Sequence, residues 1–264
     1  MTGRLGTLWA LIHRDLRGLF RRPSRVIAVI GTPLLVWGFL ASGFSSGEVL
    51  GKGESFTGFL LPGMALLLVV LASMMGAISL IQDRQEGILP ALMTSPTDRW
   101  LLAVARILSS SVIAMLQAMV MIPLVPLTGG TITPLGLLAG LTVLLLVCVM
   151  ISGFSLIMAW RIDSIAGFHG VMNLILMPLW MLSGSVAPAS SSSGLLLPII
   201  EWNPLGAAAG LLRSAFGLPE PRSDPLAWVL TVGFAALAFV LVVRVFGKES
   251  KSPRAPGERA KRHR

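Results

Sequence analysis

Six stretches of the chain are apolar for about twenty residues each and carry no Asp, Glu, Lys or Arg in the middle. Since a helix rises about 1.5 Å per residue, about 20 apolar residues can cross a hydrocarbon core about 30 Å thick. A central charge would cost about 2.5–3.5 kcal/mol on insertion scales, so its absence argues against an ion-coupled carrier built on buried carboxylates. The pattern predicts membrane spans at 26–44, 57–81, 106–127, 135–160, 165–187 and 226–245.

Residues 4–22 have a different periodicity, because apolar residues recur there at helical spacing between basic ones. A basic amphipathic helix next to a span is typical of a segment lying in the membrane interface. The pattern therefore predicts an interfacial helix before the first span. Its apolar stripe is formed by Leu5, Leu8, Trp9, Ile12, Leu16, Leu19 and Phe20.

Composition agrees with an all-α membrane protein. Of the 264 residues, 54% are apolar and only 12% are charged, whereas globular domains are about 25% charged. The net charge of +9 is concentrated outside the spans, which favours a membrane surface over a nucleic acid. The sequence has one cysteine, Cys148, and no His/Cys cluster with metal-ligand spacing, so it predicts neither a metal site nor a catalytic group.

The basic residues predict the orientation. Eighteen of the 21 lysines and arginines lie in the two ends and in the loops on the N-terminal side, and three lie on the other side: Lys52, Arg213 and Arg222. By the positive-inside rule both termini are cytoplasmic, which requires an even number of spans. We expect a multi-pass protein of the cell membrane, with one transmembrane domain at 1–247. The tail at 248–264 is predicted to be disordered and attracted to anionic lipid.

The cytoplasmic loop at 82–99 mixes charges of both signs with apolar residues. One interpretation is a solvated turn between two spans. The other is a short helix that docks on a cytoplasmic partner, and the apolar positions Ile88, Leu92 and Met93 favour it because a turn does not need them. Spacing alone does not decide between the two.

The connection at 188–225 lies on the outer side and is long for a loop. From Gly194 to Phe216 it becomes apolar again, and Gly206 and Gly210 form a G-x-x-x-G that permits close packing. Each half is too short to span, so the pattern predicts two re-entrant or interfacial helices on the outer face.

Three short stretches, in this order, resemble the ABC-2 type permeases, the membrane subunits of ABC exporters for drugs, polysaccharides and lipid-linked sugars. Phe59-Leu60-Leu61-Pro62-Gly63 opens the second span as in those permeases. Asp83-Arg84-Gln85-Glu86-Gly87-Ile88-Leu89, followed by Thr94-Ser95-Pro96, is similar to their R-E-x-G-T-L…T-P loop. Trp202-Asn203-Pro204-Leu205 with Leu212-Arg213 is similar to their N-P-L…L-R segment.

The resemblance implies that the 82–99 loop is a coupling helix seated in a groove of an ATPase subunit. The residues that it assigns to this loop are Asp83, Arg84, Glu86, Gly87, Ile88, Leu92 and Pro96. Those that it assigns to the outer re-entrant segment are Asn203, Pro204, Gly206, Gly210 and Arg213. Pro90 departs from the family pattern, and because it disfavours helix at Leu89 we expect the coupling helix to begin at Pro90 itself.

The resemblance also implies partners. Gly51-Lys52-Gly53 lacks the Ser or Thr of a P-loop and lies on the outer side, so a separate subunit is expected to bind ATP and Mg²⁺ while this chain binds no cofactor. The expected assembly contains two ATPase subunits and two permeases, identical or different, in the lipid bilayer. The expected function is ATP-driven export of an amphipathic or lipid-linked substrate.

Other functions are compatible with some of these features. An ATP-independent carrier or structural membrane subunit would share the spans, and only the 82–99 loop separates it from a coupled permease. A rhomboid-type protease would need a G-x-S-G on the fourth span and a histidine on the sixth. Here Leu156 follows Gly153-Phe154-Ser155, and 226–245 contains no histidine.

Overall fold

The computed structural model of the chain describes residues 2–20, 23–43, 56–94, 99–186, 196–219 and 221–248. These residues are helical and contain no strand, as predicted. The elements are α1 Thr2–Phe20, α2 Pro23–Gly43, α3 Phe56–Gln85, α4 Ile88–Thr94, α5 Arg99–Ala118, the 3₁₀ turns η1 Met119–Leu124 and η2 Pro126–Thr128, α6 Pro134–Arg161, α7 Ile165–Trp180, the π-helix η3 Met181–Ser185, α8 Leu196–Trp202, α9 Pro204–Phe216 and α10 Pro225–Lys248.

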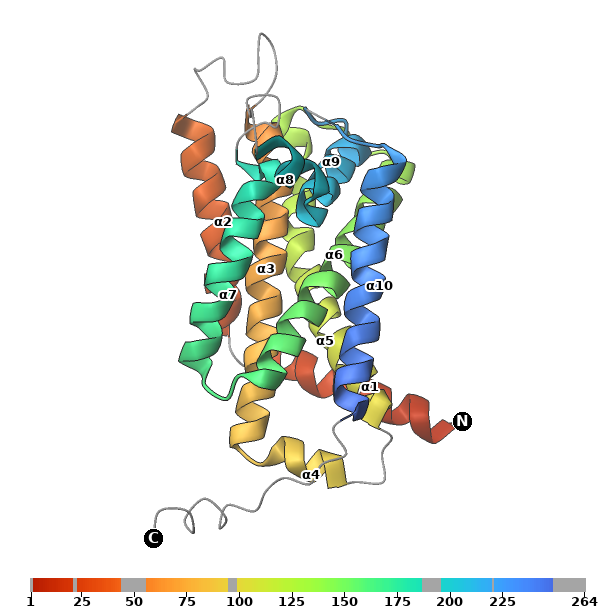
Figure 1. The fold of residues 1–264 in the computed structure, drawn as a ribbon. Helices are drawn as coiled ribbons and strands as arrows, with labels where there is room; N and C mark the ends of the chain where they lie inside the picture. The colour runs from red at the N-terminus through yellow and green to blue at the C-terminus, as the bar shows by residue number, and fades with distance from the viewer. Residues whose placement is uncertain are drawn as a thin grey trace.

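The long helices α3, α5, α6 and α10 run side by side, and α2 and α7 flank α3 (Figure 1). Helix α1 lies across one end of this bundle and packs on α5, and α4 lies at the same end. The short helices α8 and α9 lie at the opposite end, where α9 contacts α6 and α10. We call these the α4 end and the α9 end.

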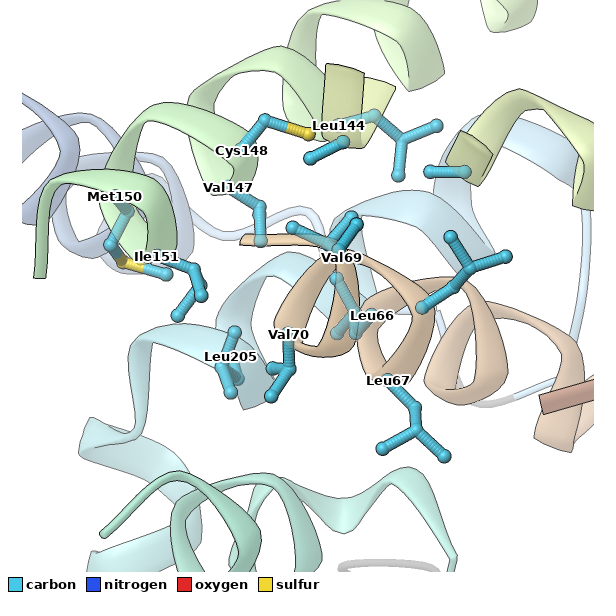
Figure 2. Close-up of a cluster of buried hydrophobic side chains, with 14 of the residues drawn as sticks. Leu66, Leu67, Val69, Val70, Leu144, Val147, Cys148, Met150, Ile151 and Leu205 are labelled. Atoms are coloured by element: carbon cyan, nitrogen blue, oxygen red, sulfur yellow. The ribbon is translucent and has the colours of Figure 1, made fainter. Parts of the chain in front are cut away.

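Helix α3 is the centre of the molecule, because most of its side chains are buried over its 30 residues. Figure 2 shows Val69 and Val70 of α3 close to Val147 and Ile151 of α6. Cys148 belongs to the same cluster and is 0% exposed. An uninterrupted apolar sequence thus forms a helix that is covered by its neighbours on most sides.

The peripheral helices expose large apolar side chains to the surroundings. Leu174 on α7 is 77% exposed, and Val229 on α10 and Phe39 on α2 are also largely exposed. Apolar surface of this kind along long helices is expected where lipid replaces water. Within the described residues five helices are long and apolar enough to span a membrane, and α2 contributes a shorter apolar stretch, Val26–Leu40.

The predicted elements all appear as helices, but two begin elsewhere. The third predicted span was expected from about Arg106, whereas α5 begins at Arg99 and Arg106 lies about two turns inside it. The short helix was expected from Pro90, whereas α4 begins at Ile88. Pro90 fits there because residues in the first turn of a helix do not need their N–H group.

Candidate functional site

A tight turn joins α3 to α4. Gly87 has a φ of +76°, in the left-handed region, and its N–H donates to the carbonyl of Arg84 at 3.2 Å. This is the usual way to end a helix, because glycine enters that region without steric cost. The carbonyl of Gly87 then accepts from Ala91 N at 3.2 Å, so the same residue also starts α4.

Helix α4 has an inner and an outer face. Leu89 is buried and lines the same small pocket as Leu102 and Phe246, as does the partly buried Leu92. Ile88 is 38% exposed, and its neighbour Glu86 is exposed too. The α3–α4 turn and the start of α4 together therefore expose a carboxylate and an apolar side chain. Pro96, which was assigned to this loop from the sequence, lies outside the described residues.

Arg84 attaches the α3–α4 turn to α6. Its Nη2 donates to the carbonyls of Ala159 and Trp160 at 3.0 and 2.9 Å, and its Nη1 binds Asp163 Oδ1 at 2.9 Å. Those carbonyls belong to the last turn of α6 and have no partner within the helix, so a guanidinium there both satisfies them and complements the helix dipole. Gln85 Nε2 adds a hydrogen bond to the carbonyl of Asp163 at 2.9 Å.

A charged network joins α1, α3 and α5 at the α4 end. The guanidinium of Arg106 forms ion pairs with Asp83 and, at 3.3 Å, with Asp15. Arg14 Nη2 lies 3.1 Å from Asp83 Oδ2 and 3.0 Å from Asp15 Oδ1. Ser109 Oγ donates to Asp15 Oδ2 at 2.7 Å. Two arginines and two aspartates therefore compensate one another, which permits Arg106 to be only 7% exposed.

Arg106 was expected at the start of the third span, and the sequence pattern assigned no role to Asp15. One local signal was present, because apolar residues flank Arg106 on both sides. An arginine in that setting needs a carboxylate partner. Its partners lie 91 and 23 residues away along the chain, so only the fold identifies them.

At the α9 end, Asn203 starts helix α9. Its Oδ1 accepts from Leu205 N at 2.9 Å, which makes it the N-cap, and Pro204 occupies the first helical position. Both residue types are favoured at these positions. Asn203 Nδ2 also donates to the carbonyl of Leu179 at 2.7 Å, so the cap attaches α9 to the end of α7.

Arg213 connects α9 to α3. It is 5% exposed and donates to the carbonyl of Phe59 through Nε and Nη2 and to the carbonyl of Gly184 through Nη2 at 3.0 Å. Trp180 Nε1 donates to the neighbouring carbonyl of Gly63 at 2.8 Å. The start of α3, the π-helix η3 and α9 are therefore held together by donors that reach backbone carbonyls.

The two glycines of the G-x-x-x-G approach connecting segments. A Cβ on Gly206 would lie 2.9 Å from the carbonyl oxygens of Ile200 and Ser183, and one on Gly210 would collide with Arg222. Arg222 N donates to the carbonyl of Gly210 at 3.0 Å. Both positions thus require close packing, as the sequence predicted, and their neighbours are α8, η3 and the segment before α10.

Arg222 also fixes the start of α10. Its guanidinium donates to both carboxylate oxygens of Asp224, at 2.7 and 3.2 Å, and these hydrogen bonds hold the pKa of that carboxyl below its usual range. The residues assigned from the sequence therefore form two groups, one at each end of the bundle, and none of the described members of one group contacts the other.

The fold is a multi-pass bundle of apolar helices, with the short helix α4 at one end and the α8–α9 pair at the other. The family model described as ABC-2 type transporter matches residues 6–216, and the chain belongs to that family. A comparison with curated proteins found no match.

Proposed function

We propose that this chain is the membrane-spanning permease of an ATP-driven exporter and that a separate ATPase subunit hydrolyses the ATP. Family membership supports a transport role. The geometry of α4 carries the more specific proposal, because this short helix projects from the bundle (Figure 1). The turn before it exposes the carboxylate of Glu86, and its first residue, Ile88, exposes an apolar side chain.

The contact with the ATPase is made by Glu86, in the α3–α4 turn, and by Ile88, at the start of α4. Asp83 and Arg84 act differently from the direct contacts that the resemblance implied, because their side chains bind within the chain. They position the turn on α1, α5 and α6. Leu92 holds the inner face of α4 against the bundle, and Gly87 sets the angle at which α4 leaves α3.

Helix α1 contributes to the same contact surface. Its exposed His13 and Arg17 lie on the helix that Arg14 and Asp15 attach to α3 and α5. A docked subunit could therefore contact α1 and α4 together. The α4 end is the cytoplasmic end in this proposal, because ATP is available there, and both termini are then cytoplasmic.

The complete exporter contains two permeases and two ATPase subunits, and ATP and Mg²⁺ bind to the ATPase. Closure of the two ATPases moves the permeases against each other. The cargo is an amphipathic or lipid-linked molecule, for which lipid-exposed apolar helices provide a route of entry. The α8–α9 pair closes the bundle at the outer end.

Co-purification of the ATPase tests the proposal. The tagged full-length chain is purified from its native membrane, and a bound protein with a P-loop is identified by mass spectrometry. We expect Ile88→Asp to lower the amount of bound ATPase about tenfold or more, since an apolar anchor in an interface is commonly worth that much. Glu86→Ala should lower it less.

The matched control is Leu127→Asp, which places the same charge on an exposed apolar residue in η2, away from α4. It should retain wild-type ATPase. If Ile88→Asp and Glu86→Ala both insert and retain the ATPase as the control does, α4 is not the coupling helix. An ATP-independent carrier or a structural subunit would then explain the spans better.

A further inference from the structure

The α4 half of the bundle contains a cavity of about 720 Å³ between α1, α2, α3 and α5. Ligand pockets in proteins commonly enclose about 300–1,000 Å³, so this space is large enough for a small amphipathic molecule. It lies within one chain, and its lining includes Glu86 and Ile88, so it borders the surface proposed to contact the ATPase.

The wall of the cavity changes along α5. Arg106 and Ser109 lie at the charged end, next to the network with Asp15 and Asp83. Gln117 lies at the other end, eleven residues further on, about 16 Å at the helical rise. These positions share one helix face, so polar groups lie at both ends of the α5 wall, about half the thickness of a hydrocarbon core apart, with Ile113 between them.

The inner end presents a hydrogen-bond acceptor that the fold does not use. Gln117 is 4% exposed, and its Nε2 donates to the carbonyl of Ile113 at 3.4 Å. Its Oε1 has no hydrogen-bond partner within the described part of the chain. A buried amide oxygen without a partner is costly, which favours a bound molecule or water that supplies a donor.

The charged and polar residues of the lining indicate the charge and the hydrogen-bonding groups of that molecule. Arg14 and Arg106 are already paired with the two aspartates, so the charged end is compensated. Toward Gln117 the lining is apolar or hydroxylic, with Val29, Met75 and Ile113 among its residues. A charge there would be buried without a counter-ion, whereas a neutral donor would satisfy the free acceptor.

We infer that this cavity binds a neutral amphipathic molecule, whose apolar body lies between α2, α3 and α5 and whose hydroxyl or N–H group donates to Gln117 Oε1. That the bound molecule is cargo rests on the proposed transport function, but its binding does not. Entry is from the α4 end, where the cavity is bordered by α1.

Two probes that differ only in the donor test the inference. Neutral 1-aminoanthracene carries an N–H donor on an apolar ring system, and anthracene lacks it. Binding to the full-length chain in lipid nanodiscs is followed by energy transfer from tryptophan to the probe. Ser79→Phe fills the cavity from α3 and gives the background from probe dissolved in lipid.

We expect saturable binding of both probes to the wild type and none to Ser79→Phe. Gln117→Leu should weaken 1-aminoanthracene about five- to tenfold and leave anthracene unchanged, as expected for the loss of one hydrogen bond. Leu116→Ala, on the neighbouring exposed position of α5, should bind both probes as the wild type does. Should Ser79→Phe fail to fold, Ile113→Phe fills the cavity from the opposite wall.

The inference is overturned if the wild type shows only the linear uptake of the filled variant, or if Gln117→Leu affects both probes equally or neither. Because these measurements need no ATPase, they are independent of the co-purification test. If the wild type does not bind the probes but Ile88→Asp still lowers the amount of bound ATPase, the cavity site is refuted and the exporter proposal stands.

Discussion

The guanidinium of Arg213 lies 4.0 Å from the centre of the Phe59 ring and also donates to the carbonyl of that same residue. The two residues are 154 positions apart and belong to two of the three stretches by which the sequence resembles ABC-2 permeases. Those stretches, at the start of α3 and on α9, therefore form one packing unit at the α9 end.

Arg213→Lys should destabilise this unit although it keeps the charge. An ammonium cannot reproduce the fork that serves the carbonyls of Phe59 and Gly184 while stacking on a ring. A loss of about 2 kcal/mol would lower the Tm by about 4–8 °C in a detergent-solubilised thermal melt. Ser214→Ala, exposed on the same helix, is the control, and an equal Tm for both variants would contradict the role assigned to Arg213.

Arg106→Met should be one of the most destabilising single substitutions at the α4 end. It leaves Asp15 and Asp83 with Arg14 as their remaining cationic partner, and breaking a buried ion pair costs about 3–5 kcal/mol. Adding Asp83→Asn should recover part of the loss by removing one carboxylate. Thermal melts of the single and double variants measure both effects.

Arg161→Met serves as the control for the Arg106 experiment, since Arg161 is exposed at the same end. It should melt close to the wild type. A double variant that is less stable than Arg106→Met would show that Asp83 does not depend on the arginine for compensation.

Substitutions at Gly87 should form a graded series. Its φ of +76° lies in a region that Asn enters readily, Ala at about 1–2 kcal/mol, and Pro not at all. Among the residues that the structure describes, no atom lies within 4 Å of a Cβ placed there, so backbone strain is the expected cause of an effect. ATPase co-purification should fall in the order Gly, Asn, Ala, Pro, with insertion unchanged. Equal co-purification across the series would show that the conformation of the Gly87 turn does not affect binding of the ATPase.

The membrane orientation can be measured with single cysteines. Because Cys148 is buried, it should react little with an impermeant maleimide. We expect Glu86→Cys to be labelled only from the cytoplasmic side and Thr131→Cys, in the loop before α6, only from outside. Labelling of Glu86→Cys only from outside the cell would refute the exporter proposal, since no ATPase could reach α4.

The helices were predictable because each depends on local information. An uncharged run such as that of α3 has few alternatives to a membrane helix, and Asn203-Pro204 is a helix start that can be recognised from residue types alone. The start of α4 was wrong by two residues because a proline in the first turn is compatible with helix, so Pro90 does not define where the helix begins.

The contacts within the two groups were not predictable in the same way. Asp83 and Arg84 are consecutive charged residues in the predicted loop, and the resemblance to ABC-2 permeases implied that both contact the ATPase subunit. The fold directs one carboxylate to Arg14 and Arg106 and one guanidinium to the end of α6. Such pairings depend on how helices that are distant in the sequence pack together, and local sequence patterns do not predict that packing.

The attachment of Arg84 to α6 has a mechanical consequence. A force applied to α4 cannot tilt α3 alone, because Arg84 and Gln85 clamp the turn to the last residues of α6. The two longest helices should then move together as a stiff lever. The α9 end of this lever includes Phe59 and Gly63, whose carbonyls accept hydrogen bonds from Arg213 and Trp180. A movement of α4 should therefore be transmitted to the α8–α9 pair at the opposite end of the bundle.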